Sequence, residues 1–313
     1  MPFKPLFKTY KRKLLGEVYN FRFGRFERQI EKRTITEAKA NEIMSGFLQS
    51  SRPFLVGRAG AMECGICWNF ARASYFDVNH SKKKLAAALN NAGISSLEDE
   101  SLDRFSLIYL ASIAQLDLIG AWKVAGMYPL LARYGSPNSQ YTALGSLEPW
   151  SAFRSNARPW TSLLHGKRIL VVHPFARSIE AQYANRANIK TIGQILPDFE
   201  LTTLVPPVTF AGQDNGASWV NNLHGLMSQA AARDFDVALI GCGAYGLPLG
   251  AFVKQMGRGA IHLGGALQLL FGIRGKRWDD RADLLPLMDE SWIRPLREER
   301  PAGADAVEQA CYW

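Results

Sequence analysis

Several features that define other protein classes are rare or absent in this 313-residue sequence. Its four cysteines are too few for the disulfide framework of a secreted protein, so we expect a reducing compartment. The first 13 residues lack the apolar segment of a secretory signal. The longest uncharged apolar run, residues 237–253, is shorter than the roughly 20 residues that cross a bilayer. These features predict a globular cytoplasmic protein.

Metal and redox motifs are also scarce. Cys64 and Cys67 form a C-x-x-C motif, but no second cysteine pair or histidine pair accompanies it. We therefore expect two small apolar side chains on one helix face rather than structural zinc.

The net charge of +9 is concentrated in the N-terminal segment. Residues 1–33 contain ten Lys or Arg against three Glu, with seven aromatic residues among them. This composition suits peripheral contact with anionic lipid headgroups at the inner face of the membrane. Nucleic acid is the rival partner, which we do not expect, and a basic segment packed on the main domain is the structural alternative.

A glycine-rich stretch at residues 236–278 is the strongest local signal. The buried-strand pattern of residues 237–240 leads into G-x-G-x-x-G at residues 241–246, and residues 247–256 have helical composition. Such a strand, turn and helix N-terminus form an anion site. Alternatively, the glycines serve only a tight turn and close packing of helix on sheet.

A second unit follows at once, with a strand at residues 260–263 and a turn at Gly264 and Gly265. Ligands of open α/β sheets lie outside the carboxyl ends of strands, so both turns should line one crevice. A dinucleotide site would place an acid roughly 20 residues beyond the glycines. That region contains His262, and no Asp or Glu lies between the glycine turn and Asp279. We therefore expect a phosphate-bearing ligand but no NAD.

Two further strand ends bear chemically active side chains. Glu63 follows the predicted strand at residues 53–57, where a carboxylate could hold a metal-diphosphate, act as a base, complement the helix dipole or pair with Arg58. His173 ends the predicted strand at residues 167–173, and Ser178 and Gln182 follow on a predicted helix. Asp117 is a candidate of lower rank.

The element order predicts an α/β fold: a Rossmann-like, mostly parallel sheet with helices on both faces and right-handed crossovers. We expect a basic helical N-terminal extension over residues 1–50, a single α/β domain over 51–278 and a packed tail over 279–313. Further helices are predicted at residues 36–49, 81–91, 102–115 and 217–233, and a strand at 199–205. Prolines mark residues 127–156 as loops.

Residues 54–63 resemble the glycosyltransferase fold type GT-D, whose members have an R-x-G-D-x-E signature after the first strand. Arg58, Gly60 and Glu63 match this signature, while Ala61 stands where its first acid belongs. Residues 236–267 are similar to the second conserved region of the family. There His262 takes the place of an acid and Gly265 that of a histidine.

Over roughly residues 50–313, the sequence more closely resembles a subgroup found among bacterial surface-polysaccharide genes. The segments that show this resemblance are GRAGAMECG, KRILVVHPFARSIEAQ, GCGAYGLPLG and HLGGALQLLFGIRGKRW. It implies sugar transfer from a UDP- or GDP-linked donor to a saccharide or polyprenyl-linked acceptor of capsule or lipopolysaccharide. The family's Asp-x-Glu members use a divalent ion such as Mn²⁺ or Mg²⁺, for which Glu63 would be the ligand here.

Under this hypothesis the donor diphosphate lies over the glycine turn of residues 241–246. The alternatives are a non-catalytic glycan-binding or scaffold protein of the same fold and a Rossmann-type NAD(P)-dependent oxidoreductase. Glu63, His173 and His262 are the candidates for metal ligand or general base. The expected nucleotide-sugar contacts are Arg58, Gly60, Ser178, Gln182, Gly241, Gly243, Tyr245, Gly246, Gly264, Gly265 and Arg277.

Overall fold

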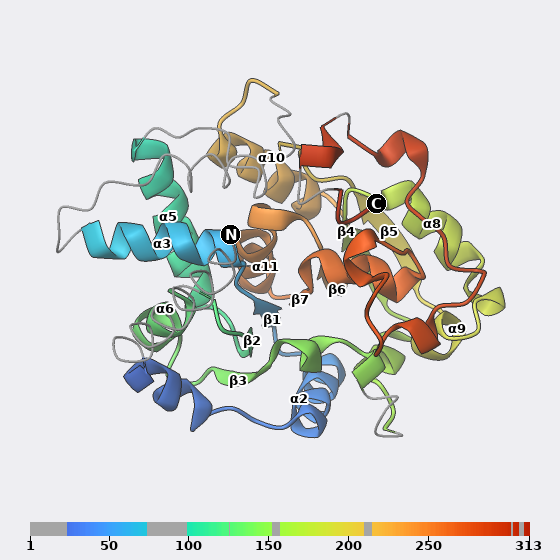
Figure 1. Ribbon diagram of the computed structural model, residues 1–313, viewed down its shortest axis with the longest axis horizontal. Helices are drawn as coiled ribbons and strands as arrows, with labels where there is room; N and C mark the ends of the chain where they lie inside the picture. The colour runs from blue at the N-terminus through green and yellow to red at the C-terminus, as the bar shows by residue number, and fades with distance from the viewer. Residues whose placement is uncertain are drawn as a thin grey trace, which may run out of the picture.

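The computed structural model of the protein describes residues 24–73, 99–124, 126–151, 157–209, 215–301, 303–306 and 310–313. Seven strands form one sheet in the order β3-β2-β1-β7-β6-β4-β5, and every neighbouring pair is parallel (Figure 1). This confirms the predicted Rossmann-like α/β fold. The strands are β1 (Phe54–Arg58), β2 (Leu118–Ala121), β3 (Gln140–Ala143), β4 (Arg168–Val172), β5 (Glu200–Leu204), β6 (Val237–Ile240) and β7 (Gly259–His262).

Helices cover both faces of the sheet, as predicted. One apolar core lies between the sheet and α3 (Ala61–Ala73), α5 (Asp99–Ile113), α6 (Met127–Tyr134), α10 (Trp219–Ala231) and α11 (Gly246–Gln255). The second lies against α2 (Glu37–Gln49), α8 (Ala176–Ala184), α9 (Ile192–Ile195) and the 3-10 helix η5 (Gly264–Phe271). Every residue of β6 and β7 is buried, because these strands are covered on both sides. No helix among the described residues has the length and apolarity to span a bilayer.

Several elements were not predicted from the sequence, among them β3, α6 and the short helix α9. The strand β3 is short, and only its two central residues, Tyr141 and Thr142, are buried. The helix α6 contains Pro129, which its first turn accommodates because the N–H groups there need no intrahelical partner. The helix predicted at residues 81–91 and residues 1–23 of the basic extension lie outside the described residues.

The segments that flank the predicted domain pack against it. Thr36 caps α2, its side chain accepting a hydrogen bond from the Lys39 backbone N–H, and Met44 and Leu48 are buried in the second core. The C-terminal segment, red in Figure 1, lies beside β4 and α8 and contributes Trp292 and Trp313 to the same core.

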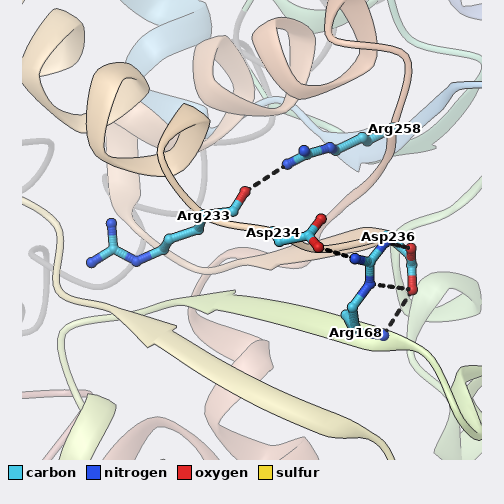
Figure 2. Close-up of polar contacts among 5 residues, drawn as sticks. All are labelled: Arg168, Arg233, Asp234, Asp236 and Arg258. Carbon is cyan, nitrogen blue, oxygen red and sulfur yellow. Dashed lines mark hydrogen bonds and ion pairs between the residues drawn. The ribbon is translucent and has the colours of Figure 1, made fainter.

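Two aspartates fix the register of neighbouring strands by the same arrangement. Asp236, directly before β6, accepts the Arg168 backbone N–H at 2.8 Å and donates its own N–H to the Arg168 carbonyl at 2.8 Å. Its other carboxylate oxygen lies 2.6 Å from the Arg168 guanidinium, which also reaches Asp234 (Figure 2). Asp117, directly before β2, exchanges both bonds with Leu55 of β1 and pairs with Lys254 at 2.7 Å.

Asp117 is therefore a structural residue, and its place among the candidate site carboxylates was wrong. It lies at the amino-terminal edge of the sheet, whereas the other candidates follow the carboxyl ends of strands.

The connections diverge at the carboxyl edge. After β1 and β6 the chain enters α3 and α11 on one face, but after β4 and β7 it enters α8 and η5 on the other. Because β7 lies between β1 and β6, and β6 lies beside β4, these switch points leave room for a crevice outside the strand ends.

We predict that Asp117→Ala lowers the free energy of unfolding by about 1–3 kcal/mol, because the Leu55 N–H loses its acceptor inside the sheet. Asp234→Ala is the matched control: its side chain is 72% exposed, so we expect a loss below about 1 kcal/mol. Urea unfolding of the two variants measures the difference. Equal losses would show that the Asp117 bond does not hold β1 in place.

Candidate functional site

A pocket opens where β1, β4, β6 and β7 end. It contains most of the predicted site residues, which come from segments far apart in the sequence. Those that line it are Arg58, Gly60, Glu63, His173, Gly241, Gly243, Tyr245, His262, Gly264, Gly265 and Arg277.

Glu63 lies in the first turn of α3, 7% exposed, with its carboxylate folded back over Gly60. A Cβ atom on Gly60 would lie 2.0 Å from the Glu63 Oε2, so a side chain at this position would displace the Glu63 carboxylate. Burial raises the pKa of Glu63, and the opposing effects of its own backbone N–H and of Arg58 are smaller. Glu63 consequently binds a proton more tightly than an ordinary glutamate.

Arg58, the last residue of β1, is the central cation of the pocket. Its guanidinium carbon lies 5.7 Å from the Trp122 ring centroid, and a Cβ on Gly264 would approach its Nε to 3.2 Å. Burial raises the pKa of Glu63, and the positive charge of Arg58 opposes that rise without cancelling it. Burial lowers the pKa of His262, and the same charge lowers it further. Within the described parts of the chain Arg58 forms no ion pair at 4 Å or less.

His173 is 3% exposed, and its Nδ1 accepts the Phe175 backbone N–H at 3.0 Å. The proton of the neutral ring therefore lies on Nε2. Burial lowers the pKa of His173 to about 3. The ring thus offers a hydrogen-bond donor to the pocket, and its geometry does not suit a general base.

His262 has the opposite tautomer. Its Nδ1 lies 3.2 Å from the Ile240 carbonyl, which only accepts, so Nδ1 donates and Nε2 keeps its lone pair. Burial, and then the charge of Arg58, lower the pKa of His262 to about 4. The ring packs on Gly246, where a Cβ would lie 2.2 Å from Cε1.

The glycines serve two different physical needs. Gly243 and Gly264 have φ values of 56° and 59°, a left-handed conformation that favours glycine. Gly241 is instead required by space, since a Cβ there would lie 2.7 Å from the Gly264 carbonyl oxygen and from the His173 ring. The alternative that the glycines serve close packing rather than anion binding therefore applies to Gly241 and Gly246.

Tyr245 completes the turn that precedes α11. Its hydroxyl lies 2.9 Å from the Thr209 hydroxyl, and its ring stacks on Trp219. As the N-cap residue of α11, Tyr245 makes no capping hydrogen bond with its side chain. The turn thus lines the pocket with backbone and one anchored aromatic ring.

Three predicted ligand contacts are not among the residues that line the pocket: Gly246, which packs against the His262 ring, Ser178 and Gln182. Glu299 accepts bonds from the Arg177 N–H at 2.7 Å, the Ser178 N–H at 3.2 Å and the Ser178 hydroxyl. Gln182 donates to the Gly272 carbonyl at 3.0 Å. Ser178 and Gln182 therefore fasten other segments of the chain to α8, and we withdraw their assignment to ligand binding.

Aromatic residues that sequence reasoning missed form one wall of the pocket. Tyr312 and Trp313 line it, and the Trp313 ring meets the Phe175 ring edge-on at 5.6 Å. Arg277 donates to the Tyr312 hydroxyl at 3.0 Å and lies over that ring. No periodic pattern marks these residues, and their aromatic character was the one available signal.

The donor set of the pocket does not fit a divalent ion held by the protein. Among the described residues that line the pocket, Glu63 supplies the one side-chain carboxylate, and Ala61 stands where the resembled family has the other. Burial raises the pKa of the Cys242 thiol, which disfavours the thiolate that a metal would need. In the described part of the chain no three His, Cys, Asp or Glu side chains gather as metal ligands.

Fold and pocket together define a Rossmann-like α/β protein with a cationic, partly aromatic pocket at the switch points of its sheet. Comparisons with protein-family models, curated proteins and solved structures found no match. Chemically, the arginine side chains suit an anion, the two neutral histidines suit hydroxyl or amide groups, and the aromatic wall suits a planar or sugar ring.

We predict that Gly246→Ala destabilises the protein by about 1–3 kcal/mol, because the new methyl group would overlap the His262 ring. Gly225→Ala, at an exposed position of α10 with open space around it, should stabilise by about 0.5–1 kcal/mol. Chemical unfolding of both variants gives the comparison. A stabilised Gly246→Ala protein would contradict the close contact.

His173 should make the fold sensitive to acid. Its pKa of about 3 lies below the ordinary 6.5, so the unfolded chain binds the proton more tightly and stability is lost as pH falls from 6.5 toward 3. His173→Asn keeps an acceptor for the Phe175 N–H but cannot titrate, so its stability should fall less over this range. Unfolding free energies across the range test this, and parallel profiles would disprove it.

Proposed function

We propose that this protein is a glycosyltransferase that moves a sugar from a UDP- or GDP-linked donor to a saccharide or polyprenyl-linked acceptor in bacterial capsule or lipopolysaccharide biosynthesis. One observation supports this most. The pocket joins Arg58 and Glu63, at the end of β1, to the glycine turns after β6 and β7. These are the two regions in which the sequence resembles GT-D enzymes.

The electrostatics of the pocket suit a diphosphate leaving group. Developing negative charge on a leaving group is stabilised by preorganised donors and cations aimed at it. Arg58 and Arg277 line the pocket, and the turn before the N-terminus of α11 forms part of its wall. The leaving diphosphate would lie among these groups.

The other pocket groups suit a sugar or a nucleobase. Hydroxyl groups both donate and accept, which matches the Nε2 donor of His173 and the Nε2 acceptor of His262. Tyr312 and Trp313 supply flat apolar surfaces. The nucleoside and sugar parts of the donor would contact this side.

Glu63 is the best candidate for a general base toward the acceptor hydroxyl. A base works best when its pKa is near the operating pH, and burial moves the pKa of Glu63 in that direction. His262, with a pKa of about 4, is a weak base, and His173 offers a donor. We therefore assign the proton transfer to Glu63.

The glycan-binding alternative has one observation in its favour. Ala61 stands where the signature of the resembled enzymes has an aspartate, while the aromatic wall would still bind a sugar ring. The oxidoreductase alternative has less support, because His262 ends β7 where a dinucleotide site would place its ribose-binding acid.

A cytoplasmic location with peripheral membrane contact forms part of the proposal. It rests on the basic and aromatic composition of residues 1–33, most of which lie outside the described residues.

The proposal predicts release of nucleoside diphosphate from a UDP- or GDP-sugar, with water as surrogate acceptor. Glu63→Gln should lower kcat by about 10²–10⁴-fold with donor affinity little changed, because the base is lost and the side-chain shape is kept. Glu42→Gln, an exposed change on α2, is the control and should leave kcat unaltered.

Two results would count against transferase activity. If no donor in the panel binds or is cleaved, the assignment fails, and measurable glycan binding alongside would favour the non-catalytic alternative. If Glu63→Gln turns over at the normal rate, Glu63 is not the base.

A further inference from the structure

We infer that the pocket binds the diphosphate of its ligand through arginine side chains, without a divalent cation. The identity of the ligand as a nucleotide sugar rests on the proposed function. The mode of binding rests on the pocket alone and can be tested with inorganic pyrophosphate.

The pocket has an excess of fixed positive charge among its described residues. The described residues that line the pocket include two arginines, Arg58 and Arg277, against one side-chain carboxyl group, that of Glu63. A guanidinium stays charged and offers two parallel N–H groups to a phosphate, a task that a metal ion otherwise performs by bridging phosphate oxygens. The pocket thus already contains the charge that a diphosphate requires.

Arg58 is positioned to meet an anionic ligand. Its guanidinium lies near the Trp122 ring and the Gly264 turn, and among the described residues no carboxylate oxygen lies within 4 Å of it. An arginine held this way and left without an ion pair is ready for an anionic ligand. The glycine turn beside it lets that ligand approach closely.

Glu63 is the one side-chain carboxylate among the described residues of the pocket, which is a small ligand set for a divalent ion. Its carboxylate is turned back onto Gly60, in its own turn of chain, and is buried. Mg²⁺ sites on phosphates generally use one or two carboxylates that face the phosphate oxygens. Ala61, where the resembled family has its other acid, supplies no side-chain oxygen.

The experiment compares pyrophosphate binding in EDTA with binding in Mn²⁺, at matched free pyrophosphate, by calorimetry. We expect dissociation constants within about threefold of each other. Arg58→Gln should weaken binding at least about tenfold in both conditions. Arg52→Gln removes the same charge before the opposite end of β1, where it is 70% exposed, and should change nothing.

A second variant tests whether the diphosphate binds next to residue 61. Ala61→Asp restores the missing acid at the first residue of α3, where a negative charge favours the helix, so the protein should fold. It should weaken pyrophosphate binding in EDTA about tenfold, and Mn²⁺ should relieve the loss. Unchanged binding by this variant would contradict our placement of the diphosphate.

The outcomes separate this inference from the proposed function. Binding that requires Mn²⁺, or no binding in either condition, overturns the inference. Transfer activity could still be found in the first case. Binding in EDTA that depends on Arg58, combined with failure of every nucleotide sugar to bind or react, would leave the inference intact and defeat the proposed function.

Discussion

The contact between the two glycine turns is the constraint on which the pocket depends. Gly241 leaves no room for a side chain, because the Gly264 carbonyl and the His173 ring both lie against it. This contact brings the ends of β4, β6 and β7 together. Arg58 of β1 then lies against Gly264, so four strand ends share one cavity. A larger residue at Gly241 would separate them.

Burial then determines the chemistry of the groups gathered there. Both histidines stay neutral because they are removed from water, and each is fixed in one tautomer by a backbone partner. Burial also raises the pKa of Glu63. Arg58 keeps its charge, as guanidinium groups do. The result is a pocket of neutral polar groups around a cation, which suits an anionic ligand with hydroxyl groups.

Much of the fold could be predicted from the sequence because the signals were local. The continuous apolar run at residues 169–172 and the glycine turn after Ile240 specify buried strands and their connections without reference to distant residues. Where tertiary contacts decide, prediction failed. Ser178 was predicted to contact the ligand, but it donates a hydrogen bond to Glu299, which lies far along the chain. Asp117 was a candidate site carboxylate, but it accepts a hydrogen bond from Leu55 at the opposite edge of the sheet.

The candidate site was predicted in part for the same reason. Residues next to strand ends, such as Glu63 and His262, had to lie at the carboxyl edge once the sheet was parallel. Nothing in the sequence marked Tyr312 and Trp313 as pocket residues, because the chain returns to the pocket through irregular segments. The tautomers of His173 and His262 depend on backbone groups that only the folded chain brings near.

The central claim is that this pocket receives a nucleoside diphosphate, and a crystal structure of the protein grown with UDP or GDP in the presence of EDTA tests it most directly. Our account predicts the diphosphate between the Arg58 guanidinium and the glycine turn of β6, with the nucleoside toward the aromatic wall. Nucleotide bound elsewhere on the protein, or an empty pocket at saturating nucleotide, would contradict it.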